Sequence, residues 1–145
     1  MTKSLNIVDC ASFNLRKASR LMAQAYDRYL QPSGLTNTQF TLLAVTSSRG
    51  PISITELAGV LGMDRTTLTR NLRLVEREGL LEVTAGMDAR TRDVRVTAKG
   101  SKTLKKATPL WQEAQTRVVD ALGRAHWRDL VKELRTISQI ARSLD

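Results

Sequence analysis

Residues 53–79 read SITELAGVLGMDRTTLTRNLRLVEREG, two short helical patterns separated by a glycine. Ser53 and Glu56 have the spacing of a capping box, in which two side chains satisfy free N–H groups at the start of a helix. Asp64 is placed to cap the second helix, which we expect over Arg65 to Glu78. The glycine that follows supplies the left-handed residue that ends it. Two capped helices joined by a tight turn predict a helix-turn-helix.

Amphipathic helices are predicted on the amino-terminal side of this motif. From Asp9 to Leu30, apolar residues recur at steps of three and four, which places them along one helical face. The sequence Pro32-Ser33-Gly34 stops this helix. Thr36 and Gln39 form a second capping box and begin the next helix, which ends before Gly50.

The carboxy-terminal side changes from helical to strand patterns and back. Short runs rich in β-branched residues, Leu80 to Thr84 and Val94 to Thr97, flank a basic loop at residues 86–92 and predict a two-stranded hairpin. Helical spacing then runs to about Leu122 and again from Ala125 to Leu144. The expected fold class is therefore mainly α with a small β-hairpin, a helix-turn-helix flanked by amino- and carboxy-terminal helices.

Composition narrows the class of function. The chain has 145 residues, 41% of them hydrophobic and 26% charged, which suits one folded domain. The formal net charge of +9 favours a polyanionic partner. Residues 1–63, 64–102 and 103–145 each carry an excess of three basic groups, so bulk charge does not locate the binding face. No apolar run has the length of a membrane span or signal peptide, and we expect a cytoplasmic protein without membrane contact.

Enzymes and other binding modules are less well supported. Cys10 and His126 are the only nucleophile and base candidates and lie at opposite ends of the chain, so we expect no enzyme, no metal site and no cofactor. Two Trp, two Tyr and two Phe offer little for an RNA-stacking platform. The basic groups are also not gathered on one amphipathic face, as a membrane-surface helix requires. Double-stranded DNA is the favoured partner.

The predicted DNA-binding residues lie on the second helix of the motif and in the hairpin. On the helix, polar side chains off the apolar stripe offer paired donors, hydroxyls and methyl groups to base edges and phosphates. In the loop, we expect Asp88 to orient the Arg90 guanidinium by a bidentate pair, ready for a narrow minor groove. Arg95 on the second strand is predicted to contact phosphate or solvent. The predicted set is Arg65, Thr66, Thr67, Thr69, Arg70, Arg73, Asp88, Arg90 and Arg92.

Four segments together resemble the MarR family of multiple antibiotic resistance regulators. They are Ser53-Ile-Thr-Glu-Leu-Ala, Met63-Asp-Arg-Thr-Thr-Leu-Thr-Arg-Asn-Leu-Arg, Glu78-Gly-Leu-Leu and Asp88-x-Arg-x-Arg-Asp-Val-Arg-Val-Thr-x-Lys-Gly100. By this resemblance the chain is a single domain, residues 1–145, with the winged helix-turn-helix at 35–100 and dimerisation helices at 9–34 and 101–145. The resemblance also places Thr66, Thr67 and Arg70 at base-contacting positions and Asp88 with Arg90 at the wing tip.

The resemblance implies an obligate homodimer that binds a palindromic operator and usually represses transcription. The residues favour a dimer independently, because the long apolar terminal helices exceed what a domain of this size needs to cover its wing. Two-fold symmetry then predicts a near-palindromic site with recognition helices about 34 Å apart.

Two kinds of switch are open. The resemblance implies release by a small phenolic or aromatic acid, for which we expect a cleft lined by Phe13, Arg16, Arg20, Phe40 and Trp111. Phe40 and Trp111, however, are side chains of the kind that more often form plain core. The alternative is oxidation of Cys10, which we expect in the first turn of a helix capped by Asp9, where the helix dipole favours a thiolate and the Asp9 charge opposes it. A small apolar filler is the competing role for this cysteine.

Overall fold

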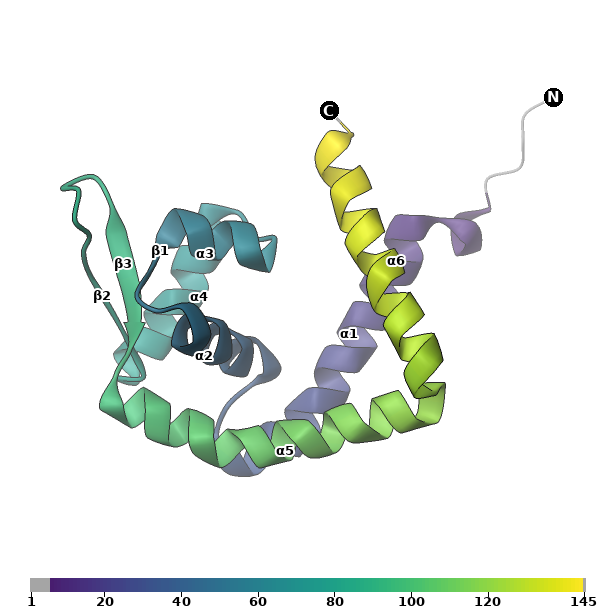
Figure 1. Ribbon diagram of the computed structural model, residues 1–145, viewed down its shortest axis with the longest axis horizontal. Helices are drawn as coiled ribbons and strands as arrows, with labels where there is room; N and C mark the ends of the chain where they lie inside the picture. The colour runs from purple at the N-terminus through teal and green to yellow at the C-terminus, as the bar shows by residue number, and fades with distance from the viewer. Residues whose placement is uncertain (1–5, 145) are drawn as a thin grey trace. The chain divides into compact units, whose positions relative to one another are not determined.

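The chain divides into two compact units at the bond between Trp111 and Gln112. The structure is a computed structural model that describes residues 6–144. Its elements are η1 (Ile7–Asp9), α1 (Ala11–Leu30), η2 (Gln31–Ser33), α2 (Asn37–Arg49), β1 (Ile52–Ser53), α3 (Ile54–Leu61), α4 (Arg65–Arg77), β2 (Leu81–Ala85), β3 (Arg92–Val96), α5 (Ala98–Leu122) and α6 (Arg124–Ser143) (Figure 1).

The start of α1 differs from the prediction. Residues 7–9 form a separate 3-10 turn, and Cys10 is the N-cap, with extended backbone and no capping hydrogen bond from its side chain. Asp9 does not cap α1, because its carboxylate accepts a hydrogen bond from the Asn6 amide instead. The expectation that Asp9 is the cap and that Cys10 lies in the first turn is therefore wrong.

The predicted capping interactions begin the next helices. At α2, the Thr36 hydroxyl accepts the Gln39 N–H at 3.2 Å and the Gln39 side chain accepts the Thr36 N–H at 3.0 Å, so the capping box is confirmed. At α3, the Ser53 hydroxyl accepts the Glu56 N–H at 3.1 Å, which is one half of the predicted box.

Helix α4 begins at Arg65 as predicted and ends at Arg77, one residue before the predicted end, with Glu78 as its C-cap. The Asp64 carboxylate accepts the Thr67 N–H at 2.7 Å and the Thr67 hydroxyl at 2.9 Å. These two bonds, the backbone one first, lower the pKa of Asp64. Gly62 before α4 and Gly79 after it both have positive φ, which suits residues without a side chain.

The sheet has three strands, one more than predicted. It is antiparallel with the order β1-β3-β2, and Ile52 of β1 pairs with Val94 of β3. The two-stranded prediction was incomplete because β1 has only two residues, too few to show an alternating pattern. Figure 1 shows α2, α3 and α4 beside this sheet, with the loop between β2 and β3 extending past them.

One hydrophobic core joins the helix-turn-helix, the sheet and the first half of α5. Leu43, Leu57, Leu68, Val75 and Val94 are fully buried in it, and Ala107 of α5 is buried with them. Its members come from elements far apart in the sequence. The packing of these side chains therefore sets the relative positions of the elements that contribute to the core. Burial of apolar surface is also the main favourable contribution to the free energy of folding.

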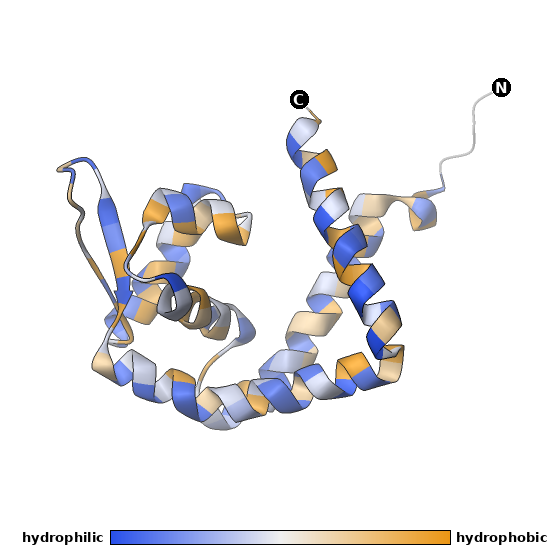
Figure 2. Ribbon diagram, viewed as in Figure 1, coloured by the Kyte–Doolittle hydropathy of each residue, from blue (hydrophilic) through white to orange (hydrophobic). Residues whose placement is uncertain are grey.

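Helix α6 belongs to the second unit and contributes no residue to this core. None of its residues is buried, and Figure 2 shows hydrophobic residues recurring along it among hydrophilic ones. Four large apolar side chains along it stay at least one third exposed: Leu130, Leu134, Ile137 and Ile140. Across residues 6–144, no helix is both long and apolar enough to cross a membrane.

Replacing Thr46 by valine is expected to stabilise the protein by about 1 kcal/mol. The Thr46 hydroxyl oxygen is buried and has no hydrogen-bond partner among residues 6–144, so the fold carries its desolvation cost without compensation. Urea unfolding measures the change. Thr41→Val is the matched control, since the Thr41 hydroxyl donates to the Asn37 carbonyl at 2.9 Å, and this variant should gain nothing. Equal effects of the two substitutions would contradict the prediction.

Asp64→Ala is expected to lower the melting temperature at neutral pH by removing the cap of α4. The pKa of Asp64 is lower in the folded chain than in the unfolded one, so its contribution is present above the ordinary aspartate pKa and is lost as the pH falls through the folded value. The gap between variant and parent should therefore close below about pH 4. Thermal unfolding from pH 7 to pH 3 tests this, and a gap that stays constant with pH would refute it.

Candidate nucleic-acid interface

The amino-terminal half of α4 presents a polar face to solvent. Its opposite side, Leu68, Leu72 and Val75, is buried in the core, which fixes the rotation of the helix about its own axis. Among the predicted DNA-binding residues of α4, Arg65, Thr66, Arg70 and Arg73 are exposed, while Thr67 and Thr69 are partly buried. This face carries donors suited to base edges and phosphates.

Thr67 is engaged in the structure of the helix start. Its N–H and its hydroxyl both donate to the Asp64 carboxylate. The hydroxyl proton is thus already used, and only the oxygen lone pairs and the methyl group are left for a base. Thr66 and Arg70 carry no such commitment among the described residues.

The wing loop is held by its backbone. The Asp88 carboxylate accepts the backbone N–H of Arg90 at 3.1 Å, and the Asp88 carbonyl accepts the Thr91 N–H and hydroxyl, both at 2.9 Å. Gly86 closes the loop, because a Cβ there would lie 2.2 Å from the Thr91 hydroxyl. Asp88 therefore orders the loop through backbone and hydroxyl hydrogen bonds.

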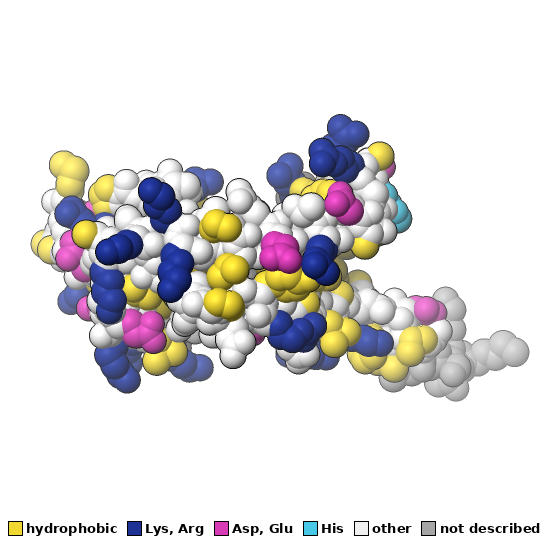
Figure 3. All heavy atoms as spheres, turned by 90° about the horizontal axis from the view of Figure 1, so that it is seen from below, with side chains coloured by type: hydrophobic (Ala, Val, Ile, Leu, Met, Phe, Trp, Pro, Cys, Tyr) yellow, Lys and Arg dark blue, Asp and Glu magenta, His cyan; other side chains and the backbone are white. Residues whose placement is uncertain are grey.

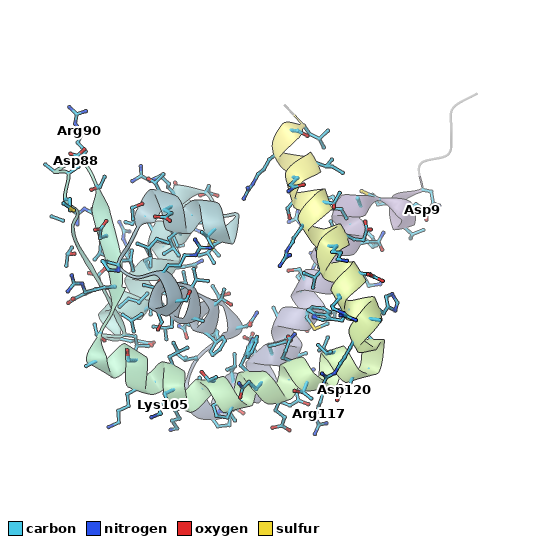
Figure 4. The ribbon with its side chains drawn as sticks, viewed as in Figure 1. Asp9, Asp88, Arg90, Lys105, Arg117 and Asp120 are labelled. Carbon is cyan, nitrogen blue, oxygen red and sulfur yellow. The ribbon has the colours of Figure 1, made fainter. Side chains whose placement is uncertain are left out.

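The predicted ion pair between Asp88 and the Arg90 guanidinium is wrong. No such pair joins these two described residues, since the carboxylate is turned to the backbone. Figure 4 shows the Arg90 side chain pointing outward from the wing tip. All donors of the guanidinium are thus available to an external acceptor.

A hollow between α4 and the wing gathers three of the predicted residues. Its volume is ≈ 350 Å³, and Thr69, Arg73 and Arg92 line it. Glu76 is the acidic member of the lining. Two arginines from different elements therefore face one concave surface. Arg95, by contrast, pairs across the strands with Glu82, Nε to Oε1 at 3.6 Å.

The five residues predicted to line a ligand cleft are not brought together. Phe40 is buried and stacks on Trp111, with ring centroids 5.6 Å apart and planes at 17°. Trp111 also borders a hollow of ≈ 340 Å³ lined by Ser19, Met22, Ala23, Tyr26 and Asn37. Phe13, Arg16 and Arg20 are exposed on α1 and do not line this hollow.

Sequence analysis missed the residues that do form this hollow. Met22 and Tyr26 are not among the predicted site residues, although their spacing of four puts them on one face of α1. Burial raises the pKa of Tyr26. A further hollow of ≈ 400 Å³ lies among α1, α2 and α4, with Asp27 and Asn71 in its lining. Asn71, on α4, is not among the predicted site residues.

Cys10 is partly buried at the amino-terminal end of α1. Its carbonyl accepts the side-chain N–H of Asn14 at 2.9 Å. The chain has no second cysteine. Within residues 6–144, no group of three or more His, Cys, Asp or Glu side chains is placed to hold a metal ion.

The known proteins that this chain resembles are transcriptional regulators. The family model of the MarR family matches residues 33–91. The M. tuberculosis transcriptional regulator MosR, solved in complex with DNA, is 45% identical with a TM-score of 0.86, and the match covers 93% of this chain and 98% of that one. The transcriptional repressor CouR, bound to a 23-mer DNA duplex, is 26% identical with a TM-score of 0.79, covering 94% and 99%.

A shorter match links the chain to the HTH-type transcriptional regulator YwoH of Bacillus subtilis (strain 168). It is 27% identical over 88 residues, 61% of this chain and 64% of that protein, which is a little under two thirds of its length. A likeness that extends over nearly the whole chain at 45% identity shows that this protein belongs to the MarR family of winged helix-turn-helix, DNA-binding transcriptional regulators, which are not enzymes.

Proposed function

We propose that the protein is a homodimeric repressor that reads a near-palindromic operator with α4 and grips the flanking minor groove with its wing. The observation that carries this proposal is the exposed arginine and threonine face of α4, opposite its buried Leu68, Leu72 and Val75. Half of a helix with such a face fits the major groove. CouR, which has a similar structure, is named a transcriptional repressor.

Individual roles follow from position and chemistry. Arg70 and Thr66 are exposed on the reading face and are assigned to base edges. Arg90 at the wing tip is assigned to the minor groove, where the potential is most negative. The remaining members of the set either hold the helix and wing against the DNA phosphates or order the wing loop. They are Arg65, Thr67, Thr69, Arg73, Asp88 and Arg92.

The homodimer is proposed from the apolar side chains that the chain leaves uncovered. Leu134 and Ile137 on α6 are 38% and 36% exposed, and Leu21 on α1 is 56% exposed. Apolar residues that recur at helical spacing on an exposed helix mark an association surface. A second copy is the partner that gives a closed, two-fold assembly matched to a palindrome.

Release by a small phenolic or aromatic acid is the proposed switch. The hollow beside Trp111 combines an aromatic wall with the polar groups of Ser19, Tyr26 and Asn37 and suits a phenol. Arg16 and Arg20 are exposed on α1 and do not line this hollow, so the proposal gives them no contact with the effector. An effector lowers operator affinity by binding better to a dimer whose recognition helices no longer match successive grooves.

Oxidation of Cys10 is the alternative switch. The thiol is partly accessible at the start of a 20-residue helix, and the chain holds no second cysteine to resolve a sulfenic acid. A disulfide between subunits or with a small thiol would then carry the signal.

The dimer should dissociate when α6 is charged. At micromolar concentration the parent should sediment at twice the chain mass, and Leu134→Glu with Ile137→Glu should shift it to the monomer, because charges cannot be buried unpaired at the interface. Lys132→Glu, an exposed neighbour on the same helix, is the control and should stay dimeric. A monomeric parent would overturn the homodimer.

Arg70→Ala and Arg90→Ala should weaken DNA binding in different ways. We use a duplex enriched by the parent from a random-sequence pool, the selected duplex, beside a shuffled duplex. Arg70→Ala should cost about 1 to 3 kcal/mol on the selected duplex only. Arg90→Ala should weaken both and reduce the salt slope by about 1. Unchanged binding by Arg70→Ala would remove its assigned role, and a loss confined to the selected duplex would make Arg90 a sequence reader.

Mild peroxide separates the two switches. If the thiol is the sensor, peroxide should release the parent from the selected duplex and leave Cys10→Ser bound, because only the thiol is oxidised. Anisotropy before and after treatment measures this. Binding by the parent that is indifferent to peroxide would leave ligand release as the switch, to be tested with simple phenols and benzoates.

A further inference from the structure

The chain leaves α4 through residues 78–80 and enters α5 through residues 97–100, and these two segments are bonded together. Thr97 donates its N–H to the Leu80 carbonyl at 3.1 Å and its hydroxyl to the Gly79 carbonyl at 2.6 Å. Lys99 donates its ammonium to the Glu78 carbonyl at 2.8 Å. Three successive carbonyls directly after the last residue of α4 are thus bound by residues at the start of α5.

One hydroxyl serves both helices. The Thr97 oxygen accepts the Gly100 N–H at 3.0 Å, which caps the start of α5, while its proton goes to Gly79. Gly100 allows the segments to approach this closely, because a Cβ there would lie 2.0 Å from the Leu80 carbonyl oxygen. The junction therefore leaves little room for one helix to slide along the other.

Charge at the junction suits the end of a helix. The last carbonyls of α4 have no partner within the helix and carry partial negative charge. Lys99 places a cation on the carbonyl of Glu78, the C-cap of α4. Lys99 is exposed, so water screens its interaction with the Glu78 carbonyl. We therefore expect this bond to orient the junction and to add little to the free energy of unfolding.

We propose that Thr97 and Lys99 are positioning residues for DNA reading, which hold α4 at the angle to α5 that base recognition needs. This inference rests on the proposed role of α4. Hydrogen bonds to base edges lose strength steeply when the distance or angle departs from ideal. Contacts to phosphates are long-ranged and tolerate small shifts. Loosening the junction should therefore reduce affinity for the selected duplex and spare the shuffled one.

Lys105 is the matched control for Lys99. Both are exposed lysines on α5, but Lys105 makes no hydrogen bond with a described residue, and Figure 4 shows it pointing away from the helix on the side opposite Arg90. Figure 3 shows lysine and arginine side chains gathered at the end of the view that holds the sheet and the start of α5. Removing either lysine changes the net charge equally, so bulk electrostatics cancel in the comparison.

The experiment measures the affinities of Lys99→Met, Thr97→Val and Lys105→Met for both duplexes by anisotropy, with thermal unfolding beside them. Lys99→Met and Thr97→Val should each bind the selected duplex about fivefold more weakly, the loss expected for one hydrogen bond. On the shuffled duplex, Lys99→Met should bind as Lys105→Met does, and Thr97→Val should bind as the parent does. Lys99→Arg and Thr97→Ser keep a donor at each position and should restore binding.

Each other outcome overturns the inference or a named part of it. Equal loss on both duplexes by Lys99→Met, absent in Lys105→Met, would make Lys99 a phosphate contact. Unchanged affinity in both variants would show that the junction does not position α4. If Thr97→Val melts too low to assay, the exposed Lys99 pair alone decides. A parent that does not distinguish the two duplexes would contradict the proposed function itself, which separates the two failures.

Discussion

The rotation of α4 about its axis is the constraint on which the interface depends. Leu68, Leu72 and Val75 are buried, and burying three such side chains is worth several kcal/mol, so turning α4 to another face would cost more than a surface contact can return. With that stripe inside, Arg70 must face outward. The core of the winged helix thus determines which side chains DNA can meet, although none of the core residues can touch it.

The two ends of α4 are fixed by different chemistry. At the start, Asp64 binds the backbone and hydroxyl of Thr67, an acceptor at the positive end of the helix. At the other end, Thr97 and Lys99 bring donors to the negative end. Rotation is therefore set by packing and the two ends by directional bonds, which together hold α4 in one orientation within the first unit.

Most of the fold followed from local signals, and the departures have physical causes. The caps at Thr36 and Asp64 act within four residues, so the sequence alone could predict them. The pairing of β1 depends on Val94, about forty residues away, and no local pattern reports it. Asp88 bound a backbone N–H instead of a guanidinium because a short loop offers its own N–H first. The predicted ligand cleft is absent because Phe40 and Trp111 stack on each other. A stacked pair of this kind does not form a wall that includes Arg16.

The same stack suggests how an effector site and the reading element are connected. Trp111 borders the hollow on one side and packs on Phe40 on the other, and it lies on the helix whose first turn holds the end of α4. Ala107, between these two points, is fully buried, so this part of α5 cannot shift without disturbing the core. If the proposed effector displaces Trp111, the strain has two routes: through the stack into α2, or along α5 to the carbonyls of residues 78–80. The second route ends directly after α4, and because it passes the buried Ala107 it runs through the core that also holds the leucines of α4.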